Sequence, residues 1–375
     1  MKRNFLLKII AAILIVISTL SMVGCDFNGE PHTHQYVDGE CSCGKKEEHV
    51  HSFVDGECSC GEVDPNFVHN HNYELGECEC GEIDSEIVTE GLVYQDIDQT
   101  TCALIGYQGS DRVIIVPEKH EGKTVTVIGE SVFMGAGEIR NVILPDTITT
   151  IKENAFNGCS DLRRIHLPKN LKVIESGAFN ECVKVAQIKF EAIECEGAAL
   201  GTERFRNVGR QTSGVTVNVK AQVTILPDCI FYSSELDKCA NIVTVKFEDN
   251  SQCKEFAYCA FFSVTSLKTV DLGLNPSLER IGDSCFGNGF CLEGFTLPRT
   301  LKYLDSWAFS NALIHAVNPV ITFEDTQGWY LVKRSVDTPA HYEEYEIPFA
   351  VEFANEDNHL EEIERYRAYD WEKSV

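Results

Sequence analysis

The sequence predicts a mainly β fold, a solenoid that follows three small β-hairpins. Two observations carry this prediction. A repeat of 23 residues runs through the chain after residue 90, and a short unit rich in cysteine and histidine occurs three times before it. Repeats of about 20–50 residues are typical of solenoids, in which each copy stacks on the next.

The composition supports a protein that folds in water. Hydrophobic residues make up 43% and charged residues 24% of the 375 residues, which is close to the average for globular proteins. The 58 Asp and Glu against 32 Lys and Arg give a net charge of -26, which repels the phosphate backbone of nucleic acids. We therefore expect no nucleic-acid partner.

Residues 1–24 have the pattern of an export signal. Lys2 and Arg3 precede an apolar run from Ile9 to Leu20, which closes on Gly24 and Cys25. This resembles a bacterial lipoprotein signal, and the resemblance implies a lipid on Cys25. The alternative is an uncleaved membrane helix, because residues 5–23 nearly span a bilayer about 30 Å thick.

The region from residue 25 to residue 90 contains the pattern H-x-H-x-[YF]-x-x-G-E-C-x-C-G three times, starting at residues 32, 49 and 69. In the first two copies an Asp-Gly pair predicts a tight hairpin turn. In the first copy the turn would place Val37 opposite Glu40, Tyr36 opposite Cys41 and His34 opposite Cys43.

Two histidines and two cysteines per copy match the ligand set of a tetrahedral zinc site. The candidate metal ligands are His32, His34, Cys41, Cys43, His49, His51, Cys58, Cys60, His69, His71, Cys78 and Cys80. Disulfides between copies are the alternative, although they leave the histidines unexplained. If zinc is bound, we expect it to be structural and to stabilise a stalk. Each hairpin is too short to bury a core, so it needs a metal or a cross-link to fold.

The 23-residue repeat places apolar residues in the same register in successive copies. Three such columns contain Ile128, Ile151 and Ile174; Phe133, Phe156 and Phe179; and Val142, Ile165 and Ile188. Within a copy, Ile165 and Leu167 alternate as in a strand that ends at Pro168. Each coil should therefore cover the apolar face of its neighbour.

Residues 151–168, IKENAFNGCSDLRRIHLP, carry the pattern I-x-x-x-A-F-x-x-C-x-x-L-x-x-I-x-L-P. This resembles the BspA-like leucine-rich repeat of bacterial surface proteins, and the resemblance covers residues 91–325. It implies a leucine-rich-repeat solenoid and a role in adhesion to host proteins, matrix or other bacteria. The match lapses between Glu191 and Gly214, so this segment is either an insertion or a degenerate coil.

Several cysteines of the repeat region are expected to pack as small buried residues. Cys159 and Cys182 follow the inward phenylalanine at the same distance, and free cysteine is among the most buried residue types. We expect the same of Cys239, Cys259, Cys285 and Cys291, while a bridge such as Cys253 with Cys259 stays open.

The outward positions of the repeat strands form the candidate ligand-binding face. By register it contains Asn141, Ile143, Arg164, His166, Gln187, Lys189, Thr244, Lys246, Thr269, Asp271, Gly294 and Thr296. Its basic residues suit a polar or acidic macromolecule, and a plain solvated surface is the alternative. The sequence has no nucleophile elbow, nucleotide-binding glycine loop or metalloprotease helix, so we predict no enzymatic activity.

Residues 326–375 leave the repeat and are expected to cap the solenoid. Ile347, Phe349, Val351 and Phe353 alternate as in a strand, and Leu360, Ile363, Tyr366 and Trp371 recur at helical spacing. An aromatic carbohydrate platform formed by Tyr366, Tyr369 and Trp371 is the alternative.

Together these features predict an adhesion lipoprotein on the extracellular face of a bacterial membrane, bound to a protein or glycan ligand. Two alternatives are a zinc-handling lipoprotein and a structural component of the envelope.

Overall fold

The computed structural model describes residues 89–289, 291–311 and 320–332, together with nine short segments (23–25, 31–33, 36–37, 40–41, 53–54, 57–58, 349–350, 363 and 370–373). The chain divides into two units, Met1–His71 and Asn72–Val375. Each unit is described by itself.

The described segments of the first unit form three antiparallel strand pairs. They are β1 (Val23–Cys25) with β2 (Pro31–Thr33), β3 (Tyr36–Val37) with β4 (Glu40–Cys41), and β5 (Phe53–Val54) with β6 (Glu57–Cys58). In β3 and β4, Tyr36 pairs with Cys41 and Val37 with Glu40, which is the register that the Asp-Gly turn predicts. The third cysteine and histidine unit lies outside the described residues.

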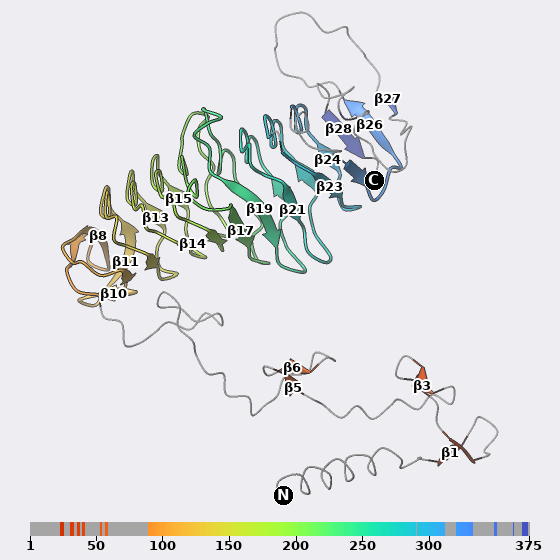
Figure 1. Ribbon diagram of the computed structural model, residues 1–375, viewed down its shortest axis with the longest axis horizontal. Helices are drawn as coiled ribbons and strands as arrows, with labels where there is room; N and C mark the ends of the chain where they lie inside the picture. Colours follow the sequence, from red (N-terminus) through yellow and green to blue (C-terminus); the bar gives the residue numbers. More distant parts are fainter. Residues whose placement is uncertain are drawn as a thin grey trace, which may run out of the picture. The chain divides into compact units, whose positions relative to one another are not determined.

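The second unit is a β-solenoid of about nine turns, and each typical coil contributes a strand to each of two sheets (Figure 1). The first of these is a seven-stranded parallel sheet, here called the main sheet. Its strands, in spatial order, are β14 (Arg164–Leu167), β16 (Gln187–Phe190), β17 (Val215–Val219), β19 (Ile242–Phe247), β21 (Thr269–Asp271), β23 (Gly294–Leu297) and β25 (Val320–Phe323). Before it, β9 (Val113–Ile115) and β12 (Asn141–Ile143) form a separate parallel pair.

The second sheet of the solenoid is divided into two parts. The N-terminal part consists of β7 (Leu92–Asp96), β8 (Thr101–Tyr107), β11 (Lys123–Ile128), β13 (Thr150–Ile151) and β15 (Val173–Ile174), with β10 (Lys119–His120) beside β11. The C-terminal part consists of β18 (Ile225–Leu226), β20 (Glu255–Phe256), β22 (Arg280–Ile281), β24 (Tyr303–Leu304), β28 (Asp370–Lys373), β26 (Trp329–Val332) and β27 (Phe349–Ala350).

The repeat register predicted from the sequence is confirmed. Ile128 pairs with Ile151, and Ile151 pairs with Ile174, in parallel strands. All three side chains are at most 1% exposed. Burying a large aliphatic side chain contributes about 1.5–3 kcal/mol, so one such column stabilises every coil that it crosses.

A stack of eight phenylalanine rings runs through the core at one corner of the coils. Neighbouring ring centroids lie between 5.0 and 5.5 Å apart, in the order Phe133, Phe156, Phe179, Phe205, Phe231, Phe261, Phe286 and Phe309. Phe205 belongs to the segment where the sequence match lapses. Because its ring occupies the stack between Phe179 and Phe231, this segment is a degenerate coil that keeps its place in the core.

The degenerate coil affects the two sheets differently. In the main sheet, β16 pairs directly with β17, so that sheet stays continuous. In the second sheet this coil supplies no strand, and the sheet is divided between β15 and β18. Single backbone hydrogen bonds continue across the gap, such as Glu196 N–H to the Lys172 carbonyl at 2.7 Å and Ala198 N–H to the Asp228 carbonyl at 2.9 Å.

Antiparallel strands cover both ends of the second sheet. At the start β7 pairs antiparallel with β8, and at the end β28 pairs antiparallel with β24, with Trp371 opposite Leu304. The helical spacing predicted for Trp371 is therefore wrong. Trp371 lies in a strand because the edge of β24 offers unpaired backbone groups, which β28 satisfies by antiparallel pairing. Ile363 is helical and Phe349 lies in a strand, as expected.

The other residues of the predicted terminal pattern lie outside the described residues: Ile347, Val351, Phe353, Leu360, Tyr366 and Tyr369. Trp371 and Trp329 are both 2% exposed, and Phe323 contacts both rings. Trp371 is thus a packing residue of the cap and offers no exposed platform to a carbohydrate.

Candidate functional site: the outer face of the main sheet

The parallel register of the main sheet aligns the predicted face residues in two rows. The first row consists of Arg164, Gln187, Thr216, Thr244, Thr269, Gly294 and Val320. The second row consists of His166, Lys189, Asn218, Lys246 and Asp271, and it is continued by the pair Thr296 and Thr322. All of these residues are exposed or half-buried, whereas their neighbours in each strand point into the core.

The prediction is wrong for two residues, Asn141 and Ile143. They are only 3% and 5% exposed, and every residue of β12 is buried. The physical reason is that β12 pairs with β9 outside the main sheet, at the end where the chain enters the solenoid. There the Thr89 hydroxyl accepts a hydrogen bond from Ile115 N–H at 2.8 Å, so the incoming chain lies against this strand pair.

Four further residues lie on this face that the repeat register did not predict: Thr216, Asn218, Val320 and Thr322. The first two lie in β17, directly after the degenerate coil, and the last two lie in β25, so neither strand falls on the 23-residue register. A usable signal was present in β17, because Val215, Val217 and Val219 alternate with polar residues.

A carboxylate neutralises part of the basic character of this face. Glu191 Oε2 lies 3.3 Å from His166 Nε2, and Glu191 Oε1 lies 3.0 Å from Lys189 Nζ. Burial of the Glu191 carboxyl opposes its ionisation, but hydrogen bonds and charge from His166 and Lys189 outweigh burial and lower its pKa to about 2. Because Glu191 pairs with Lys189, the exposed Lys246 on β19 contributes more to the basic character of the face than Lys189 does.

The C-terminal end of the face contains a groove of about 440 Å³ over β21, β23 and β25. Its polar side chains are Asp271, Thr296, Thr322 and Glu324. The Thr296 and Thr322 hydroxyl oxygens lie 3.2 Å apart, and Glu324 accepts a hydrogen bond from Arg299 N–H at 3.1 Å. Hydroxyls and carboxylates around a shallow groove can hydrogen-bond a polar ligand.

Gly294 lines this groove and is the one member of the first row that has no side chain. Every other member of the first row carries a side chain, whereas Gly294 leaves a gap between Thr269 and Val320. A Cβ atom added at Gly294 would lie 3.2 Å from the Val320 carbonyl oxygen, so the strands approach closely there. Val320 is 42% exposed and provides an apolar wall beside the gap.

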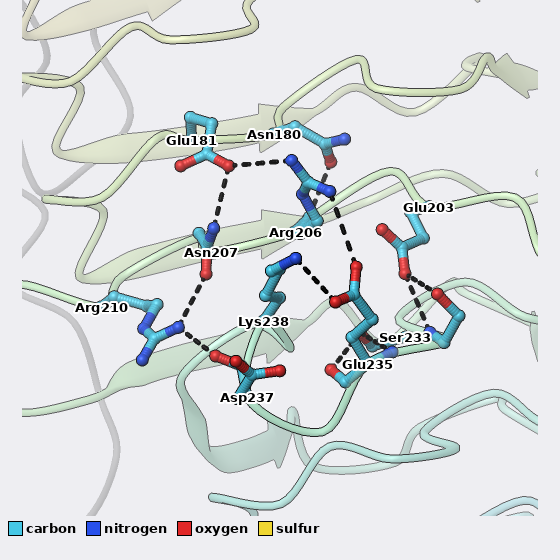
Figure 2. Close-up of polar contacts among 11 residues, drawn as sticks. Asn180, Glu181, Glu203, Arg206, Asn207, Arg210, Ser233, Glu235, Asp237 and Lys238 are labelled. Carbon is cyan, nitrogen blue, oxygen red and sulfur yellow. Dashed lines mark hydrogen bonds and ion pairs between the residues drawn. The ribbon is translucent and has the colours of Figure 1, made fainter.

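Figure 2 shows a second polar cluster, which links coils near the degenerate segment. Glu181 accepts a hydrogen bond from Asn207 at 2.8 Å and forms an ion pair with Arg206 at 3.4 Å. Arg206 also lies 3.9 Å from Glu235, which pairs with Lys238 at 2.6 Å. Arg206 and Lys238 are paired with acids, whereas the exposed Arg210 donates to the Asn207 side chain and to the Asp237 backbone carbonyl, so this cluster mainly ties coils together.

The buried cysteines behave as predicted in most cases. Cys159 and Cys182 are fully buried, and their thiols donate to the carbonyls of Phe133 and Phe156 at 3.1 and 3.2 Å. Burial raises the pKa of Cys159 to about 12. Cys291 is an exception, because it is only partly buried.

Most of the predicted metal ligands lie outside the described residues: His34, Cys43, His49, His51, Cys60, His69, His71, Cys78 and Cys80. The backbones of His32, Cys41 and Cys58, and of the predicted lipidation residue Cys25, lie in short strands. Within the described part of the chain, no group of three or more His, Cys, Asp or Glu side chains could hold a metal ion. The same part contains no helix long and apolar enough to span a bilayer.

Several solved structures are similar to this chain. A leucine-rich repeat protein of T. pallidum (TpLRR) has 23% sequence identity and a TM-score of 0.41, covering 54% of this chain and 88% of its own. A leucine-rich repeat protein of Bacteroides ovatus has 16% identity and a TM-score of 0.35, covering 64% and 66%. The pneumococcal vaccine antigen PcpA has 14% identity and a TM-score of 0.28, covering 65% and 51%.

Comparison with curated protein sequences gave no match. The sequence profile of the BspA type leucine rich repeat region matches residues 126–237 and 200–315, six copies in all and more than half of the chain. The profile includes the degenerate coil, in agreement with the position of Phe205 in the ring stack. The chain therefore belongs to the BspA type leucine rich repeat family.

Proposed function

We propose that this protein is an adhesion lipoprotein that binds a protein or glycan of a host, a matrix or another cell through the outer face of the main sheet. The observation that carries the proposal is the pair of polar rows that crosses all seven parallel strands and leads to the groove at Gly294. Membership of a family of binding scaffolds supports a binding role and favours no catalytic one.

The dimensions of the face favour a macromolecular ligand. Seven strands at about 4.8 Å spacing give rows roughly 30 Å long. Basic side chains at Arg164 and Lys246 lie in the earlier coils, and acidic side chains at Asp271 and Glu324 lie at the groove. A ligand that complements both ends must extend over several coils.

Anchoring by a lipid on Cys25 would hold this acidic protein on the extracellular face of a bacterial membrane. Its net charge of -26 gives it no attraction to an anionic membrane surface, so a covalent anchor is needed for stable attachment. Labelling of growing cells with a fatty-acid analogue should mark the wild type and leave Cys25→Ala unmarked.

The binding proposal is tested by measuring capture of the purified protein on immobilised matrix proteins and glycans. The double variant Arg164→Glu with Lys246→Glu should weaken capture at least tenfold, because it reverses two charges on the face. The matched control is Lys119→Glu with Lys169→Glu, which reverses two exposed charges outside the main sheet. An equal effect in both variants, or none in either, would contradict the proposed face.

The second candidate is zinc handling by the cysteine and histidine units. The pairing of Tyr36 with Cys41, and of Phe53 with Cys58, favours hairpins that bring the flanking ligands together. We expect up to three zinc ions per chain by elemental analysis, and one fewer in Cys41→Ser with Cys43→Ser. Tight zinc that resists exchange indicates a structural stalk, whereas rapid exchange indicates metal handling.

A structural envelope component is the third candidate. It would be favoured if the lipid is present but neither a ligand nor exchangeable zinc is found.

A further inference from the structure

Two cysteines occupy equivalent corners of neighbouring coils. Cys229 follows β18 and Cys259 follows β20, and both have a φ of 52°. The same corner has a left-handed backbone at Ser131, Asn154, Gly177, Ser284 and Trp307. Asparagine and glycine favour this conformation, whereas two successive cysteines there have no conformational advantage.

The strand register brings these cysteines side by side. Leu226 pairs with Phe256 in parallel strands, and the same offset of 30 residues places Cys229 beside Cys259. Cys229 N–H donates to the Tyr258 carbonyl at 2.9 Å, and the Phe231 and Phe261 rings stack at 5.5 Å. Neighbouring chains about 4.8 Å apart lie within the Cα separation of roughly 4.4–6.8 Å that a disulfide requires.

The two thiols contact each other and lie just below the surface. Interaction between the two side chains lowers the pKa of Cys229 and raises that of Cys259. The cysteines are 1% and 2% exposed, but the adjacent residues Asp228 and Tyr258 are exposed. A small oxidant therefore needs only a local opening of the corner to reach them.

A buried arginine accompanies the pair. Arg204 is 4% exposed, and its Nε and Nη1 atoms have no hydrogen-bond partner within the described part of the chain. Arg204 occupies the position directly before the stacked phenylalanine, where Ala155, Ala178 and Ala260 are found in other coils. A guanidinium buried there is costly unless a negative charge compensates it.

The Cys259 side chain has the largest effect on Cys229 and lowers its pKa, whereas burial and the charge of the adjacent Asp228 carboxylate raise it. The Arg204 charge lowers the pKa of Cys229 and so partly offsets Asp228. Burial lowers the pKa of Arg204, and the charges of Cys195 and Cys229 oppose this shift. A thiolate at Cys229 would supply the negative charge that the buried guanidinium lacks.

We propose that Cys229 and Cys259 are a redox-active pair that forms a disulfide between two coils, with Cys229 as the attacking sulfur and Arg204 as the residue that stabilises its thiolate. With a low-molecular-weight disulfide as oxidant, the Cys229 thiolate attacks one oxidant sulfur, which breaks the oxidant bond and releases one thiolate. Cys259 then loses its proton to solvent and attacks the Cys229 sulfur, which releases the second thiolate. The protein loses two protons and two electrons, and the oxidant becomes two thiols.

Cys159 and Cys182 provide an internal comparison. They also lie on adjacent coils at matching positions, but their thiols donate to backbone carbonyls. Burial raises the pKa of both. They should therefore remain reduced under conditions that oxidise Cys229 and Cys259.

The experiment incubates the full chain with oxidised glutathione and maps linked peptides by mass spectrometry. We expect a Cys229–Cys259 bridge, no Cys159–Cys182 bridge, and glutathione bound at Cys229 in the variant Cys259→Ser. Cys259→Ser and the reciprocal variant Cys229→Ser should both fold, because serine occupies this corner at Ser131 and Ser284. A pair that stays reduced, or modification at Cys259 in place of Cys229, would overturn the proposal.

The role of Arg204 is tested separately by the pH dependence of thiol alkylation. Arg204→Met keeps the volume and removes the charge, and it should slow alkylation of Cys229 at neutral pH about tenfold and move the reaction profile to higher pH. Arg204→Lys should retain most of the wild-type rate. An unchanged profile in Arg204→Met would show that the arginine is only structural.

Discussion

At the scale of single residues, the electrostatics of the face depend on contacts between coils. Glu191 lies beyond the end of β16, yet it contacts His166 on β14 and Lys189 on its own strand. Register predicts that His166 and Lys189 share a face, but it cannot predict which carboxylate turns toward them. The basic character expected at Lys189 is therefore reduced by a neighbour that the repeat pattern does not mark.

The lowered pKa of Glu191 makes a pH-dependent contribution to stability. Because the folded-state pKa is about 2, below the usual value near 4.3, the contribution is fully present above about pH 4.3 and is lost as the pH falls toward 2. Glu191→Gln should reduce the free energy of unfolding by about 2 kcal/mol at pH 7, and the difference from wild type should shrink between pH 5 and pH 3.

This comparison is made by urea unfolding at each pH, with the exposed Glu118→Gln as control. A difference between wild type and Glu191→Gln that stays constant down to pH 3 would contradict the assigned pKa.

At the scale of elements, the repeat pattern predicted most coils but left one undecided. Ile128, Ile151 and Ile174 pair as their spacing requires, since a fixed period places equivalent side chains over one another. The segment after Glu191 departs from the period, and only the core shows that Phe205 completes the ring stack. Sequence spacing alone cannot distinguish an inserted loop from a longer coil, because both shift the register by a few residues.

The integral role of the degenerate coil leads to a stability prediction. Phe205→Ala should reduce the free energy of unfolding by about 3–5 kcal/mol, as should Phe156→Ala in a regular coil, because each leaves a cavity in the same stack. Leu200→Ala is the control within the same segment, because Leu200 is 58% exposed. The free energies of unfolding are measured by thermal and urea unfolding. If Phe205→Ala destabilises the protein no more than Leu200→Ala does, Phe205 is not part of the core stack.

At the scale of the whole molecule, the C-terminal end of the solenoid differs in form from the helical pattern that the sequence predicts. The last coil needs a cover, and the aromatic C-terminus provides one, as the sequence suggests. The spacing of Leu360, Ile363 and Trp371 predicts a helix, but Trp371 lies in strand β28. The unpaired backbone edge of β24 decides the outcome, and this edge exists only once the preceding coils have stacked.

Loss of the cap should destabilise the coils next to it more than distant ones. In a solenoid each coil contacts only its neighbours, so the effect of a terminal change decays along the array. Trp371→Ala should therefore accelerate amide hydrogen exchange at least tenfold in β22 and β24 while β13 and β15 keep their wild-type rates. Leu274→Ala, at a side chain that is 68% exposed, is the control. Uniform acceleration throughout the solenoid would mean that it unfolds as a single unit.

The gap at Gly294 gives a repetitive molecule one distinct position. Nearly identical coils would offer the same contact many times, and a partner could bind at any of several registers along them. A ligand that contacts the gap at Gly294 has a single binding site in each chain, so binding there saturates at one ligand per chain. Duplication of a coil elsewhere in the solenoid would shift the position of this site along the array without creating a second site.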